Sequence, residues 1–321
     1  MLPEEKKMVK NKTLKSKNWN DMAILGIFAI LVVGLTILKP VFLTPDNLIN
    51  VIRQVSITAI IGIGMTFVLI SGEIDLSVGS IAALSGIIVT MSLKDGWPMA
   101  AAIVMAMGAG ALCGLANGSI HVYARIPSFI VTMGMLNIAR GLVLVITNSY
   151  PVTGLPDSFK VIGRGYVGFL PVPVIIMLIC YVLGYVVLKY IKFGRSIFAI
   201  GGNIEAARLS GISVNRNKIL IYVLCGVTAA IGGIVLASRM FSGQPSAGDG
   251  LELNAIAACV IGGTSTTGGK GRIWGTFLGA LIMGIITNGM NLLNISTNWQ
   301  LIVQGAIIII AVGLDRIKNT D

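Results

Sequence analysis

The chain has 321 residues, of which 55% are hydrophobic and only 12% are charged, and its mean hydropathy is +0.88. Soluble globular domains carry about 25% charged residues, so this composition excludes a soluble globular protein. The net charge of +11 does not indicate a nucleic-acid partner, because the basic residues cluster in loops and tails, where they set topology and contact anionic lipid. We therefore expect an all-α polytopic membrane protein.

The apolar runs predict about ten membrane spans, since a bilayer core requires about 20 apolar residues per helix. The spans are expected near 22–38, 48–70, 76–92, 98–119, 128–147, 172–190, 219–239, 251–262, 274–291 and 298–314. The run at 251–262 is too short to cross unless it extends or forms a half-helix. The predicted organisation is thus a basic tail at 1–21, one transmembrane domain at 22–314 with a polar loop at 191–218, and a second tail at 315–321.

The distribution of positive charge predicts the orientation of these spans. Of the 24 Lys and Arg residues, 17 fall in segments on one side, five on the other, and Arg140 and Arg239 lie within spans. Positive charge in short loops marks the cytoplasmic side, so both termini and the loop at 191–218 are expected in the cytoplasm. The expected location is the cytoplasmic (inner) membrane.

The polar loop is the longest polar interruption after the N-terminal tail. Between 203 and 212 its polar and apolar residues alternate at helical spacing, which predicts a short helix on the membrane surface. An ordinary solvated connector is the alternative.

Glycine is abundant, with 40 residues, and small residues let membrane helices approach closely. Two glycine-rich hairpins, at 71–80 and 262–272, interrupt the apolar runs at comparable places. They indicate either an internal repeat with interrupted helices, as many transporters have, or two unrelated tight loops.

Several motifs with a chemical meaning are rejected. The GxGxxG pattern at 163–168 lies between spans and not in a βαβ unit, and the glycine-rich run at 263–271 lacks the residues of a phosphate-binding loop. Glu73 and Asp75 indicate a cap or an exposed loop face rather than a metal site, and His121 stands without a nucleophile or ligand cluster. The four cysteines lack paired spacing. We expect no catalytic residue, metal or cofactor in this chain.

Polar residues inside spans are the better candidates for function, because hydrocarbon penalises unpaired polar groups. Uncharged amides offer donors and acceptors and therefore suit a polyhydroxylated solute such as a sugar. Hydrogen bonding between helices is the alternative for any single residue. The candidates for a substrate pathway are Asn137, Arg140, Asn288, Asn291, Gln300 and Gln304.

The motif EAARLSG at 205–211 resembles the loop by which permease subunits of ATP-binding cassette importers bind their ATPase. Together with GEIDLSVGS at 72–80, QPSAG at 244–248, ELNAIAA at 252–258 and GGTS-x-x-GG-x-G at 262–271, it is similar to the permeases of the ribose, xylose, arabinose and galactose importer class. The resemblance covers about 42–315. One departure is Glu73, where the family is expected to have a small apolar residue or glycine.

The resemblance implies about ten membrane helices and a permease that passes a monosaccharide, with ribose as the expected sugar. It assigns ATPase coupling to Glu205, Ala206, Ala207 and Gly211. The implied partners are a separate ATPase that binds ATP and Mg, an extracytoplasmic sugar-binding protein and a second permease copy. The permease itself is not expected to be an enzyme.

An ion-coupled secondary sugar transporter is the alternative. Such proteins carry an acid within the membrane as the ion site, whereas the 13 acids here are expected in tails, loops or span ends. An intramembrane enzyme would need a cluster of nucleophile, base or metal ligands, and none is visible in the sequence.

Overall fold

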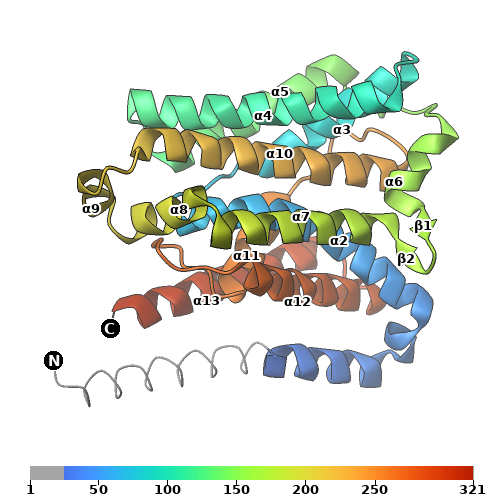
Figure 1. The fold of residues 1–321 in the computed structure, drawn as a ribbon. Helices are drawn as coiled ribbons and strands as arrows, with labels where there is room; N and C mark the ends of the chain where they lie inside the picture. The colour runs from blue at the N-terminus through green and yellow to red at the C-terminus, as the bar shows by residue number, and fades with distance from the viewer. Residues whose placement is uncertain (1–24, 321) are drawn as a thin grey trace.

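The computed structural model describes residues 25–320 and is almost entirely helical (Figure 1). The predicted tail at 1–21 and the start of the first predicted span lie outside the described residues. The long helices are α2 (Pro45–Ile70), α4 (Met99–Ala124), α5 (Ser128–Thr147), α7 (Val172–Tyr190), α10 (Val214–Met240), α12 (Ile273–Leu292) and α13 (Thr297–Thr320). Shorter apolar helices are Leu25–Leu38, α3 (Val78–Lys94) and α11 (Leu251–Ile261).

Each predicted span coincides with one of these helices, and seven of those in the described part are long and apolar enough to cross a membrane. The predicted all-α polytopic class is therefore confirmed. Several boundaries differ, and α4 ends at Ala124 rather than 119. Helix α10 begins at Val214 rather than 219 because the polar residues before the apolar run continue the helix, and α13 continues beyond 314 into the predicted tail.

The bundle has two distinct ends (Figure 1). One, which we call the α9 end, carries α8 (Lys192–Gly202) and α9 (Ile204–Leu209). The other, the α6 end, carries a 3-10 turn (Asp157–Phe159), α6 (Lys160–Arg164) and the hairpin of β1 (Tyr166–Val167) and β2 (Leu170–Pro171). A second 3-10 turn, η1 (Pro40–Leu43), precedes α2 at the α6 end. Helix α13 finishes at the α9 end.

Two passes through the bundle are broken. Helix α2 finishes at the α9 end, the chain returns through the non-helical residues 71–77, and α3 completes the pass to the α6 end. The second broken pass runs in the opposite direction. Helix α10 finishes at the α6 end, residues 241–250 return inward, and α11 continues to the α9 end. The two broken passes meet where Gly79 at the start of α3 contacts Gly248 just before α11.

Each broken pass is part of a four-helix unit, and the two units have the same arrangement of helices. Helix α3 packs on α4, α5 and α10, and α11 packs on α12, α13 and α2, so each half-helix has equivalent partners. The run α2–α5 and the run α10–α13 therefore form an inverted repeat of the kind found in transporters. A repeat is present, but the interpretation of the hairpins at 71–80 and 262–272 as its matching parts is wrong. The segment 71–77 corresponds to 241–250, whereas 262–272 is the turn between α11 and α12.

Helices α4 and α10 approach so closely that no side chain fits between them at several positions. A Cβ atom at Gly110 would overlap the carbonyl oxygen of Gly226, and one at Gly226 would overlap that of Gly110. This contact explains part of the glycine content, because close backbone approach supplies packing that apolar surface alone does not supply in lipid. The contact holds α10 against the unit α2–α5.

The close approach predicts opposite outcomes for two glycines of α4. Gly110→Ala should lower the free energy of unfolding by about 1–3 kcal/mol, the usual cost of overpacking. Gly108→Ala, where no atom lies within 4 Å of the added Cβ, should leave stability unchanged or slightly higher. Thermal unfolding of the purified chain in detergent measures both. Equal behaviour of the two variants would contradict the packing described here.

Candidate transport pathway and coupling surface

Arg140 holds the non-helical segment 241–250. Its Nη1 donates to the carbonyl oxygens of Pro245 (2.6 Å) and Ala247 (2.9 Å), and its Nη2 lies 2.5 Å from Asp249 Oδ1. Non-helical backbone inside a bilayer must find hydrogen-bond partners within the protein. Arg140 provides them from α5, so this arginine bonds one segment of the bundle to another.

The start of α3 is held by a second set of polar groups. Asp75 is fully buried, and its Oδ1 accepts hydrogen bonds from the backbone N–H of Ser77 (2.8 Å) and from the Ser77 hydroxyl (2.5 Å). Asn117 of α4 donates to the same hydroxyl (2.9 Å). Asp75 thus fixes the turn that leads into the half-helix, but it does not cap the first turn of α3 and it is not on an exposed loop. The segment that carries it turns inward, which places an acid inside the bundle, where the sequence predicted none.

The other predicted pathway residues do not gather around one cavity. Asn288 of α12 exchanges hydrogen bonds with Asn47 of α2 (2.8 and 3.1 Å). Asn291 accepts from Gln300 (2.8 Å) across the turn between α12 and α13. Asn137 is exposed and donates to a carbonyl of its own helix, and Gln304 is half-buried on α13. Three of the five amides, Asn288, Asn291 and Gln300, are thus paired with another amide.

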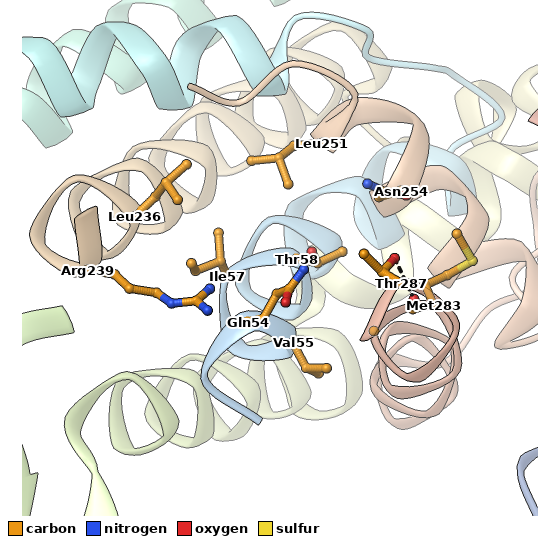
Figure 2. A pocket seen from close by; sticks show the side chains of 11 residues that line it. Gln54, Val55, Ile57, Thr58, Leu236, Arg239, Leu251, Asn254, Met283 and Thr287 are labelled. Atoms are coloured by element: carbon orange, nitrogen blue, oxygen red, sulfur yellow. Dashed lines mark hydrogen bonds between the residues drawn. The ribbon is translucent and has the colours of Figure 1, made fainter. Parts of the chain in front are cut away.

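A cavity of about 160 Å³ lies elsewhere, between α2, α10, α11 and α12 (Figure 2). The guanidinium of Arg239 extends into it toward Gln54 and Ile57. None of the six predicted pathway residues lines it. A signal was present in the sequence, since Gln54 and Thr58 share a helix face at i,i+4 and Arg239 was recognised as a charge within a span.

Three charged or ionisable side chains meet at the α9 end. Glu73, just beyond α2, lies 2.5 Å from Lys218 Nζ of α10 and 3.1 Å from His121 Nε2 of α4. Burial raises the pKa of the Glu73 carboxyl, but the hydrogen bonds from His121 and Lys218 outweigh this effect and lower the pKa from 4.5 to about 2. Glu73 is therefore an ionised link between the first broken pass, α4 and α10.

Helix α9 is the predicted surface helix, and it is capped at both ends. The Asn203 side chain accepts a hydrogen bond from the backbone N–H of Ala206 (3.0 Å). At the other end, Ile212 N–H bonds the carbonyl of Ala207 and Gly211 N–H bonds that of Arg208, the pattern of a Schellman motif with glycine in the left-handed conformation (φ +79°). These bonds make α9 a defined protrusion.

The predicted coupling residues are divided between two faces of this protrusion. Glu205, Ala206 and Gly211 are exposed, whereas Ala207 is buried against Ile200 and Val214. Sequence reasoning missed Leu209, whose side chain is 88% exposed at the tip. A single exposed leucine is common on protein surfaces, and this one lies beside the exposed Glu205 and Ala206 of the same helix.

A groove of about 890 Å³ runs beside α9, between the end of α4 and the start of α10. Arg125, Arg208 and Arg216 line it together with Tyr123. Arginine and tyrosine are enriched at protein interfaces. The groove and α9 together form a basic surface, which we call the coupling surface.

Comparisons with known proteins identify relatives of this chain. Residues 47–312 match the family model described as branched-chain amino acid transport system / permease component. The chain is 47% identical over 297 residues to the ribose import permease protein of Bacillus subtilis (strain 168), covering 92% of both chains. It is 43% identical to that of Escherichia coli (strain K12), covering 90% of this chain and 92% of the relative. The xylose transport system permease protein of the same E. coli strain is 35% identical, covering 94% of this chain and 93% of the relative. No solved structure matches the chain.

The lowered pKa of Glu73 predicts a pH-dependent contribution to stability. A carboxyl whose folded pKa is depressed stabilises the fold above its unfolded pKa and loses this effect as pH falls. Glu73→Gln should therefore reduce stability by about 2 kcal/mol at pH 7. The difference from the parent chain should shrink as pH falls from 4.5 toward 2.

Thermal unfolding over a pH series measures this difference. Asp157→Asn, which removes an exposed ion pair with Lys160, is the control and should change stability little, since exposed pairs contribute about 0–1 kcal/mol. A gap between Glu73→Gln and the parent that stays constant or widens at low pH would refute the assignment.

Proposed function

The chain belongs to the branched-chain amino acid transport system / permease component family, and we propose that it is the membrane permease of an ATP-binding cassette importer for ribose. The observation that carries this proposal is the 47% identity with a ribose import permease protein over 92% of both chains. The broken passes meeting in the bundle support it, because transporters place substrate sites beside interrupted helices.

In this proposal the permease forms the pathway and is not an enzyme. A separate ATPase subunit binds ATP and Mg, so this chain needs no cofactor of its own. A sugar-binding protein outside the membrane delivers the ribose, and a second copy of the permease completes the transporter. The exposed apolar faces of α4, α5, α7 and α13 contact lipid or the second copy.

The α9 end faces the cytoplasm, with both chain termini on that side of the inner membrane. The excess of Lys and Arg in the segments at this end supports the orientation. The ATPase then binds the coupling surface, with Leu209 inserted into an apolar pocket and Glu205, Ala206 and Gly211 around it. The role of Ala207 is to anchor α9 on Val214 at the start of α10.

The substrate pathway includes Arg140 in a positioning role. Its bonds to Pro245 and Ala247 hold the second broken pass in place, and a change in those bonds would move α11. The amides at 137, 288, 291, 300 and 304 remain candidates for the substrate pathway. They would act there where the sugar or the second copy of the permease reaches them.

Ribose uptake by proteoliposomes tests the function. Vesicles carrying this chain and its ATPase, supplied with the sugar-binding protein on one side and ATP on the other, should accumulate radiolabelled ribose. Uptake should stop when ATP is withdrawn and continue when ion gradients are collapsed. Uptake that follows an ion gradient without ATP would instead favour an ion-coupled secondary transporter, and uptake of another pentose in preference to ribose would correct the substrate.

The same vesicles test the coupling surface. Leu209→Ser should lower co-purification of the ATPase and ribose uptake at least tenfold, because removing a central apolar anchor from an interface costs about 2 kcal/mol or more. Leu209→Met, which keeps an apolar side chain, is the control and should behave like the parent chain. If Leu209→Ser retains normal association and uptake, the ATPase binds elsewhere.

A further inference from the structure

Five polar side chains line the cavity of Figure 2; Thr287 bonds the Met283 carbonyl of its own helix, and the other four do not bond one another. These four are Gln54 and Thr58 of α2, Arg239 of α10 and Asn254 of α11. Within residues 25–320, no hydrogen bond or ion pair is formed by any of these four side chains, whereas the amide pairs Asn47–Asn288 and Asn291–Gln300 are bonded. The cavity therefore collects the unsatisfied polar groups of three separate helices.

The four side chains are half-buried, and the Asn254 Oδ1 atom is fully buried without a partner. Such unpaired groups are unfavourable, because each costs the desolvation of a donor or acceptor to the extent that it is buried. Four of them around one hollow indicate a site that a polar molecule fills. The cavity volume of about 160 Å³ corresponds to roughly five waters at about 30 Å³ each. A small organic solute fits this space.

The side chains that line the cavity determine which kind of solute it can bind. Arg239 offers only donors, while the two amides and the hydroxyl offer both donors and acceptors. No carboxylate lines the cavity, and Val55, Leu251 and Met283 form apolar walls. An inorganic anion would suit Arg239 but would leave the amide oxygens of Gln54 and Asn254 unmatched. A molecule with several hydroxyls on a carbon skeleton matches the whole lining.

The cavity lies where a solute could be held during transport, beside the second broken pass. It lies beside Leu251, the first residue of α11, and reaches Arg239 near the end of α10 at the α6 end. A solute in it would touch the second broken pass. We propose that each permease copy holds one monosaccharide molecule in this cavity, with Arg239, Asn254 and Thr58 as its hydrogen-bond partners. The identity of the sugar, ribose, rests on the proposed function.

Titration of the purified full-length chain with D-ribose, followed by saturation-transfer NMR, tests the site and detects weak binding. Ribose should bind saturably. Thr58→Val and Asn254→Leu should each raise the dissociation constant for ribose about five- to tenfold, which is the effect of one lost hydrogen bond. Thr147→Val is the matched control, because its hydroxyl bonds only the Val143 carbonyl of its own helix. Unchanged thermal midpoints would show that the variants are folded.

Several results would overturn the proposal. Absence of saturable ribose binding would mean that the cavity holds water only. Displacement of ribose by excess inorganic phosphate would identify an anion site at Arg239. Equal binding by the parent, Thr58→Val and Asn254→Leu would place the sugar elsewhere. The proposed function is judged separately, since ATP-driven uptake that persists in both variants would reject this site and leave the importer intact.

Discussion

The structure depends on how non-helical backbone is satisfied inside a membrane bundle. Two passes are broken near their middle, and in hydrocarbon each unpaired N–H or carbonyl would cost several kcal/mol. The protein meets this constraint with Arg140 on the carbonyls of Pro245 and Ala247 and with Asp75 on the N–H of Ser77. The contact between Gly79 and Gly248 then brings the two breaks together without side chains between them.

The same breaks connect the middle of the bundle with the coupling surface. The loop between α11 and α12 returns to the α9 end, where Gly269 N–H donates to the carbonyl of Ile70 (2.8 Å), the last residue of α2. Gly201 of α8 packs on that same carbonyl. Direct contacts therefore join α8 to the end of α2 and to the loop that follows α11.

Much of the fold could be predicted because hydropathy and length determine where helices cross a bilayer. The run at 251–262 was too short to cross unless it extended or formed a half-helix, and the structure has a short helix of 11 residues there. The repeat was assigned to the wrong pair of segments because both hairpins are rich in glycine, and local composition does not reveal the order of contacts. The partners of the span amides were equally hidden, since Asn47 and Asn288 are 241 residues apart. The cavity was missed for the same reason, although Gln54, Thr58 and Arg239 were visible in the sequence.

The role of Arg140 in holding the broken pass can be measured directly by hydrogen exchange in lipid nanodiscs. In the parent chain, the backbone amides of 241–250 should exchange slowly. In Arg140→Met they should exchange at least about tenfold faster, because two hydrogen bonds to a charged donor are lost, while the amides of 71–77 keep their rates. Unchanged exchange at 241–250 in Arg140→Met would contradict the account.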